Sequence, residues 1–474
     1  MLHDTLAALP ELLLAGTALA LFVTARVWRR PMLVGGLTAA AIGAAGLVLA
    51  AQPAGVHDLF SGMLTRTPWI ALIQLGILSV LLLVTLMALG TTALTDDLPE
   101  FFGLLLLSGA GLLLVTGAQS LVMVYVGLEL VSLTSYLLTG FLRREATSAE
   151  GGLKYFLVGT LATAMLLYGV SWIYGATGTL DLPTLTSQLL SGTHPNHSLV
   201  VVGLVLIAAG LAFKVGLVPF HAWAPDAYEG APTAVAAFVS AGPKLAGFAL
   251  LLRIFWLAFR GLTPAWTAVL EVVAILTMTL GNVAALRQTN VKRLLAYSSI
   301  AQAGYIVIGV VVASPSGAFA VTYYALAYVL MNLAAFCCVI AVANATGRED
   351  LGAYAGLAQT HPVLAAGFAV ALLSLAGIPP LAGFLAKVWI FAAALASGHT
   401  TLAVVAAVNS VIAVFYYALL LKQMYLSPPP PTGALAESPW PLRLALGAAL
   451  AGVVLLGLWP TPLLVRIAAT LPTR

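Results

Sequence analysis

The chain has 474 residues, of which 61% are hydrophobic and only 8% are charged, and its formal net charge is +4. About a quarter of the residues of a typical soluble domain are charged, so this composition excludes a water-soluble globular protein. The mean hydropathy of +1.05 indicates a chain whose surface is solvated by lipid.

Apolar segments long enough to cross a membrane recur along the whole sequence. A transmembrane helix needs about 20 largely apolar residues. The fourteen predicted spans are 7–28, 32–51, 68–89, 101–118, 120–141, 153–175, 199–227 (interrupted), 232–258, 264–286, 290–312, 316–344, 362–397 (interrupted), 401–426 and 441–466. The first span follows Asp4 rather than a basic residue, so it is predicted not to be a signal peptide. The sequence therefore predicts an all-α polytopic membrane protein.

Positive charges gather in alternate connections between these spans. One set of connections carries Arg26, Arg29, Arg30, Arg143, Arg144, Arg287, Lys292, Arg293, Arg348, Lys422 and Arg443. The other set carries little beyond Arg66, Arg260 and Arg474. The positive-inside rule places the first set in the cytoplasm, so both termini are predicted on the outer side of a bacterial cytoplasmic membrane. The same bias explains the net charge and gives no reason to expect nucleic acid as a partner.

The residues that usually bind metals and cofactors are not grouped in this sequence. Cys337 and Cys338 are adjacent in one span, where they point about 100° apart and are predicted to pack in the core. Only His221 lies deep within a span, and the HPNH stretch at 194–197 is predicted to be a solvated loop. Neither a GxxxxGK[ST] loop nor a GxGxxG fingerprint occurs. We therefore expect no cofactor and no metal in this chain.

Ionisable side chains within the predicted spans are the strongest functional signal, because such groups are rare in membranes and usually functional. They are Glu129, Lys154, Lys214, Lys244 and Lys387, with His221 beside the first interruption. Three of the lysines lie deep in their spans, whereas Lys154 lies near a cytoplasmic end and is also explained by snorkelling. Glu271 and Arg253 lie toward span ends and are predicted to be structural or interfacial.

The two interrupted spans predict an internal repeat. GLVPF at 216–220 and AGIPP at 376–380 break their helices 160 residues apart, and other spans align at similar offsets. This predicts three helices in 1–100, a five-helix repeat in 101–258, a second in 264–426, and a cytoplasmic loop with a last helix in 427–474. Since five crossings are an odd number, the second repeat is inverted. Inverted repeats with discontinuous helices are typical of ion pathways.

Lysine is suited to proton transfer within such a pathway. Its free pKa is near ~10.4, and burial alone changes the pKa of such a group by up to ~3–5 units. A nearby carboxylate opposes this change, so Glu129 and Lys214 are predicted to form a switch that holds and releases a proton. Lys244 is predicted to be the middle proton-binding site of the pathway, and Lys387 the proton-binding site farthest from Lys214. Arginine does not deprotonate in proteins, and the deep cations here are lysines.

Several long motifs carry a resemblance to a known family. YVGLELVSLTSYLLTGF, residues 151–180, 213–244 and 281–305, and LAGIPPLAGFLAKVWIF resemble subunit N of the proton-pumping NADH:quinone oxidoreductase, respiratory complex I. The likeness is strong over 95–425. It implies fourteen helices, an antiporter-like fold, and a proton channel driven by quinone reduction elsewhere in the complex. The expected partners are the antiporter-like subunit M and the small membrane subunits.

The resemblance also suggests roles for individual residues. Glu129 and Lys214 match the family's ion pair, Lys244 its central lysine and Lys387 the lysine of the second repeat. Lys387 favours subunit N over subunit M, which has glutamate there. Glu271 departs from the pattern expected at its position.

Two other classes of function also fit parts of this sequence pattern. A subunit of a multisubunit sodium/proton antiporter shares the predicted fold and the helix breaks. A self-contained transporter of a small solute would need more varied polar groups than the buried lysines and carboxylate found here. The sequence does not distinguish an NADH-linked complex from related ferredoxin-, F420- or hydrogenase-linked complexes.

Overall fold

The structure is a computed structural model, and it describes residues 6–25, 27, 30–52, 57–94, 97–192, 196–429 and 438–471. Outside the described residues lie Asp4, Arg26, Arg29, His194 and Arg474.

Nearly all described elements are helices. The first part of the chain forms α2 (Leu9–Thr24), α3 (Pro31–Ala51), the strands β1 (His57–Leu59) and β2 (Leu64–Arg66), α4 (Pro68–Leu89), α5 (Leu98–Gly117), α6 (Leu121–Thr139), α7 (Ala146–Thr177), α8 (Leu182–Ser191), α9 (His197–Val215), α10 (Trp223–Gly230) and α11 (Thr233–Leu251), which continues as the π-helical turn η1 (Leu252–Ala258). The second part forms η2 (Arg260–Leu262), α12 (Thr263–Ala285), α13 (Val291–Val311), α14 (Pro315–Thr346), η3 (Leu351–Tyr354), α15 (Leu357–Thr360), α16 (Pro362–Ala376), α17 (Ala382–Ala396), α18 (Thr400–Leu426), α19 (Trp440–Leu458) and α20 (Thr461–Thr470). The short hairpin of β1 and β2 was not anticipated from the sequence.

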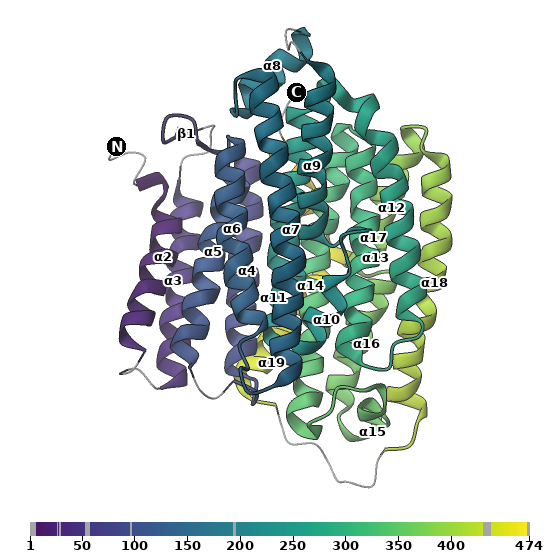
Figure 1. Cartoon of the computed structure of the whole chain (residues 1–474). Helices are drawn as coiled ribbons and strands as arrows, with labels where there is room; N and C mark the ends of the chain where they lie inside the picture. The colour runs from purple at the N-terminus through teal and green to yellow at the C-terminus, as the bar shows by residue number, and fades with distance from the viewer. Residues whose placement is uncertain are drawn as a thin grey trace.

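The described helices account for the predicted spans. Twelve of them are long and apolar enough to cross a membrane, and α2 and the pair α16–α17 coincide with the two remaining predicted spans. The prediction of an all-α membrane protein is therefore confirmed. In Figure 1 the helices stand side by side, from α2 and α3 at one edge to α18 at the other.

The last predicted span, 441–466, was wrong in one respect. The helix ends at Leu458, and a separate short helix begins at Thr461. Pro460 explains the interruption, because proline has no amide hydrogen and disfavours helical backbone at the residue before it. The main helix, α19, packs on α14 and α4 instead of following α18.

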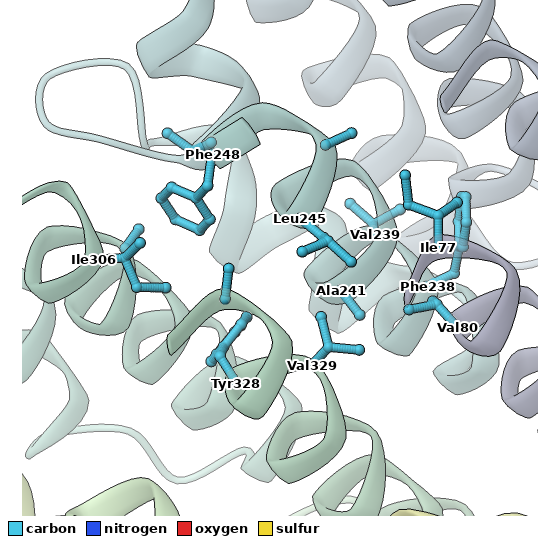
Figure 2. Packing of buried hydrophobic residues seen from close by; sticks show 14 of the residues in the cluster. Ile77, Val80, Phe238, Val239, Ala241, Leu245, Phe248, Ile306, Tyr328 and Val329 are labelled. Atoms are coloured by element: carbon cyan, nitrogen blue, oxygen red, sulfur yellow. The ribbon is translucent and has the colours of Figure 1, made fainter. Parts of the chain in front are cut away.

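Three helices form the centre of the bundle. All of α11 is buried, as is most of α13 and α14, whereas only about a third of α3, α7 and α18 is covered within the chain. Figure 2 shows Phe238 and Leu245 of α11 among residues of α4, α13 and α14. The sequence of α11 is rich in alanine and glycine, which lets neighbouring backbones approach closely in a membrane bundle.

Several local features occur twice at corresponding places in the chain. Two helices of 32 residues, α7 and α14, both end at a glycine with positive φ, Gly178 and Gly347. Isolated antiparallel bridges join Ser120 to Asp181 and Asn290 to Asp350. Both interrupted spans also break at a glycine with positive φ.

Candidate functional site

The first helix break lies next to Lys214. Helix α9 ends because Gly216 adopts φ 79°, a left-handed conformation that glycine tolerates. Neighbouring side chains satisfy the backbone groups that the break frees: Trp223 donates to the carbonyl of Phe213 (3.1 Å), and Thr277 of α12 accepts from the amide of Val218 (3.0 Å). The break is therefore a built feature of the fold, as the sequence predicted.

Lys214 is buried and reaches across to α6. It is 3% exposed, and its Nζ donates a hydrogen bond to Oγ of Ser132 at 3.1 Å. Ser132 in turn donates to the carbonyl of Leu128 (2.7 Å). The half-buried Glu129 lies three residues before Ser132, on the same helix face. Among the ion pairs of the described residues none joins Glu129 to Lys214, and Ser132 is the hydrogen-bond partner of the lysine.

Lys244 occupies the centre of the molecule and is bound to Ser299 of α13. Its Nζ donates to both the carbonyl oxygen (3.0 Å) and Oγ (2.5 Å) of Ser299. The hydroxyl of Tyr328 donates to the same Oγ at 2.7 Å, and that of Tyr228 lies 3.4 Å away. A Cβ added at Gly216 would lie 3.6 Å from the lysine Nζ. The end of the broken helix therefore contacts the central lysine.

Lys387 lies beside the second helix break, as Lys214 lies beside the first. Its Nζ donates to the carbonyl of Ala376 (2.8 Å), the last residue of α16, where the helix dipole favours a cation. The Nζ also lies 4.9 Å from the centre of the Tyr305 ring, within range of a cation–π interaction. Gly377 ends α16 with φ 89°.

Polar side chains of α13 and its neighbours connect the surroundings of Lys244 and Lys387. Gln302, one turn after Ser299, donates to the carbonyl of Leu375 (2.9 Å) and accepts from the hydroxyl of Tyr324 (2.6 Å). Tyr305, a further turn along, accepts from Asn282 at 3.0 Å. These residues were not predicted as part of the site, although the run YSSIAQAGY is unusually polar for a buried helix.

Lys154 and His221 lie apart from this buried line. The Lys154 side chain is 45% exposed and forms ion pairs with Glu150 (2.6 Å) and Asp226 (2.8 Å). Asp226 also pairs with Arg293 of α13 (2.6 Å), so this cluster joins α7, α10 and α13. His221 lies in the first break, half-buried, and its Nδ1 has no hydrogen-bond partner among the described residues.

The remaining membrane charges have structural partners. Arg253 donates to the carbonyl of Thr116 and to Oε1 of Gln119, both at 2.7 Å. Glu271 contacts His399 at 3.1 Å. Among the described residues no group of three metal-ligating side chains occurs.

The glycine at the second break provides a first test. A Cβ at Gly377 would lie 2.8 Å from Cδ of Lys387, whereas a Cβ at Gly347, which also has positive φ, would meet nothing within 4 Å. Both Gly→Ala changes strain the backbone by about 1–2 kcal/mol. We expect only Gly377→Ala to impair proton transport per assembled protein, measured by proton uptake in membranes. Equal loss in both variants would show that backbone strain alone is responsible.

Comparison with known proteins identifies the family of this arrangement. Residues 118–413 match the family described as "NADH:quinone oxidoreductase/Mrp antiporter, TM". The chain belongs to this family. NADH-quinone oxidoreductase subunit N of Anaeromyxobacter sp. is 39% identical over 96% of this chain and 94% of its own length. NAD(P)H-quinone oxidoreductase subunit 2 of Thermosynechococcus vestitus is 46% identical over 69% of this chain, and the match spans 65% of that relative.

A solved structure shows the same fold. A chain in "Respiratory complex I from Thermus thermophilus with bound Aureothin" is 33% identical, with a TM-score of 0.83, and the match covers 97% of this chain and 100% of that one. The family resemblance inferred from the motifs is therefore confirmed.

Proposed function

We propose that the chain is a proton-translocating membrane subunit of a bacterial respiratory NADH:quinone oxidoreductase, moving protons while quinone is reduced elsewhere in the complex. The observation that carries this proposal is the row of buried lysines, Lys214, Lys244 and Lys387, beside two broken helices. Each ammonium meets hydroxyl or carbonyl oxygens, and no described ion pair includes any of the three. Because none of these lysines is paired with a carboxylate in the described part of the chain, each can release its proton without leaving a buried negative charge unpaired.

The chemistry of the partners suits stepwise transfer. A serine hydroxyl accepts one hydrogen bond and donates another, as Ser132 does between Lys214 and the carbonyl of Leu128. The hydroxyl of Ser299 offers the same possibility to Lys244, and Gln302, one turn further along α13, holds the carbonyl of Leu375 beside the second break. Glu129, beside Ser132, would favour the charged form of Lys214 when the two approach.

Lys154 and His221 would serve proton uptake at the cytoplasmic end. Lys154 lies in a solvent-exposed cluster of opposite charges with Asp226. His221 lies in the helix break, between Lys214 and Asp226 in the chain, and an imidazole can both accept and donate a proton. In this proposal the charged cluster binds protons from the cytoplasm, and the helix break lets them reach the buried lysines.

The paired local features support an inverted repeat, with α5–α11 forming the first unit and α12–α18 the second. The terminal glycines of α7 and α14 and the two isolated bridges occur at matching places. The helices before α5 form a separate N-terminal group, and α19 returns to pack beside α4. The distribution of arginines supports cytoplasmic placement of the connections that contain Arg143 and Arg348, with both termini outside.

The names of the relatives favour a quinone oxidoreductase over a sodium/proton antiporter. We expect an affinity-tagged chain to purify from bacterial cytoplasmic membranes with subunit M, the small membrane subunits and the quinone-reducing subunits. Mass spectrometry of the purified assembly is the test. Recovery with antiporter subunits alone, together with sodium-dependent transport in washed membranes, would contradict the proposal.

A further inference from the structure

A groove outside the lysine pathway lies between α2, α5, α6 and α7. It has a volume of about 510 Å³, and its lining includes the apolar side chains of Phe22, Leu104, Leu137, Leu153 and Phe156. This volume is within the range of about 300–1,000 Å³ that is usual for small-molecule sites. The groove lies where α2 and α6 end and α5 and α7 begin, at the lower end of the bundle in Figure 1. It is therefore placed at one membrane surface.

Charged side chains surround the mouth of this groove. A second cavity of about 410 Å³ shares Phe141 and Arg143 with it and adds Arg144, Asp97 and Glu145. Within the described part of the chain, none of these four charged residues belongs to an ion pair. In another loop, Arg348 pairs with Asp350 at 2.8 Å. The mouth thus presents two cations and two anions that form no ion pair with another described residue.

Glu100 adds an acceptor inside the groove. It lies in the first turn of α5, and its Oε2 is buried with no hydrogen-bond partner among the described residues. A buried carboxylate oxygen without a donor is costly, because it has lost its water without a replacement. A donor from a bound molecule would remove this cost.

We propose that the groove binds a phospholipid with a primary-amine head group, of the phosphatidylethanolamine type. Arg143 binds the lipid phosphate in a charge-assisted hydrogen bond, and the ammonium donates to Glu100. One acyl chain lies against Leu104, Leu153 and Phe156. A zwitterion matches both signs of charge at the mouth, whereas an anionic head group would be repelled by Asp97, Glu145 and Glu100.

The test uses the whole complex reconstituted into phosphatidylcholine vesicles that contain a trace of phosphatidylethanolamine with a photoreactive acyl chain. We expect light-induced labelling of the peptides that contain Leu104 and Leu153. Unlabelled phosphatidylethanolamine should compete, whereas phosphatidylcholine and phosphatidylglycerol should compete at least several-fold less well. Glu100→Gln should weaken labelling by about tenfold, as expected for loss of a hydrogen bond to a charged group.

Three further variants complete the test. Arg143→Gln should also reduce labelling, and the matched control Arg348→Gln, at a paired arginine of a different loop, should not. If Glu100→Gln prevents assembly, Leu153→Trp fills the groove without changing charge and should abolish labelling. The proposal is overturned by labelling that survives these changes, by stronger competition from phosphatidylglycerol, or by no labelling of the groove in the wild-type complex. None of these outcomes depends on proton transport.

Discussion

Lys214→Arg is expected to stop proton pumping although it preserves the positive charge. The guanidinium can occupy the position beside Ser132 but does not release its proton. Glu129→Gln should be similarly damaging, because it removes the charge that favours the protonated form of Lys214. We expect each change to lower pumping by at least about 100-fold, the lower end of what a positioned proton-transfer group contributes. The measurements are quinone reductase activity and proton uptake in membranes, normalised to the amount of assembled complex.

Lys292 provides the matched control for this experiment. It is also a buried lysine, 4% exposed, but it is held by an ion pair with Glu349 (2.9 Å) and a hydrogen bond to the carbonyl of Ala231 (2.9 Å). These contacts are structural, so Lys292→Arg should retain most of the pumping. Near-normal pumping by Lys214→Arg would show that Lys214 is architectural as well, and the proposed mechanism would be wrong.

Ser299→Ala is expected to have the second large effect. This change removes the hydroxyl shared by Lys244 and Tyr328, and it leaves the lysine only the carbonyl oxygen of the same residue. We expect pumping to fall by at least about tenfold, less than the ~100-fold or more that a titrating proton-transfer group contributes, because Lys244 itself remains. Ser299→Thr retains a hydroxyl and should restore much of the pumping. The assays are those used for Lys214.

The adjacent Ser298 is the control for Ser299. It is equally buried, but its hydroxyl pairs with Tyr417 at 2.6 Å and not with a lysine. Ser298→Ala should reduce the amount of assembled complex at most, and leave pumping per complex unchanged. If both alanine variants lose pumping equally, the effect comes from helix packing, and Ser299 has no special part in transfer.

The positions of the two helix breaks could be predicted from the sequence, because they depend on the chemistry of single residues. GLVPF and AGIPP contain a glycine that tolerates positive φ and a proline that lacks an amide hydrogen, so the interruption follows from backbone properties alone. Pro460 follows the same rule but was overlooked inside an apolar run that is long enough to span a membrane. The hairpin of β1 and β2 was missed because its two strands have only three residues each.

The contacts of the charged residues could not be predicted from the backbone properties of single residues. Lys154 occupies an apolar-looking stretch, yet its side chain reaches a surface cluster because Asp226 and Glu150 lie beside it. The sequence predicts a switch between Glu129 and Lys214, and the fold adds Ser132 as the hydrogen-bond partner of the lysine. Spacing along one helix indicates which face a side chain occupies, but not which side chain another helix brings to that face.

By itself, the sequence determined that this is a membrane protein of many helices, where two helices break, and that deeply placed lysines dominate its buried charge. These properties depend on composition and on the backbone chemistry of single residues. Only the tertiary structure decided what each lysine meets. Ser132 lies 82 residues from Lys214, and Ser299 lies 55 residues from Lys244. Contacts over such separations depend on how helices pack and rotate against one another, and no local pattern encodes that packing.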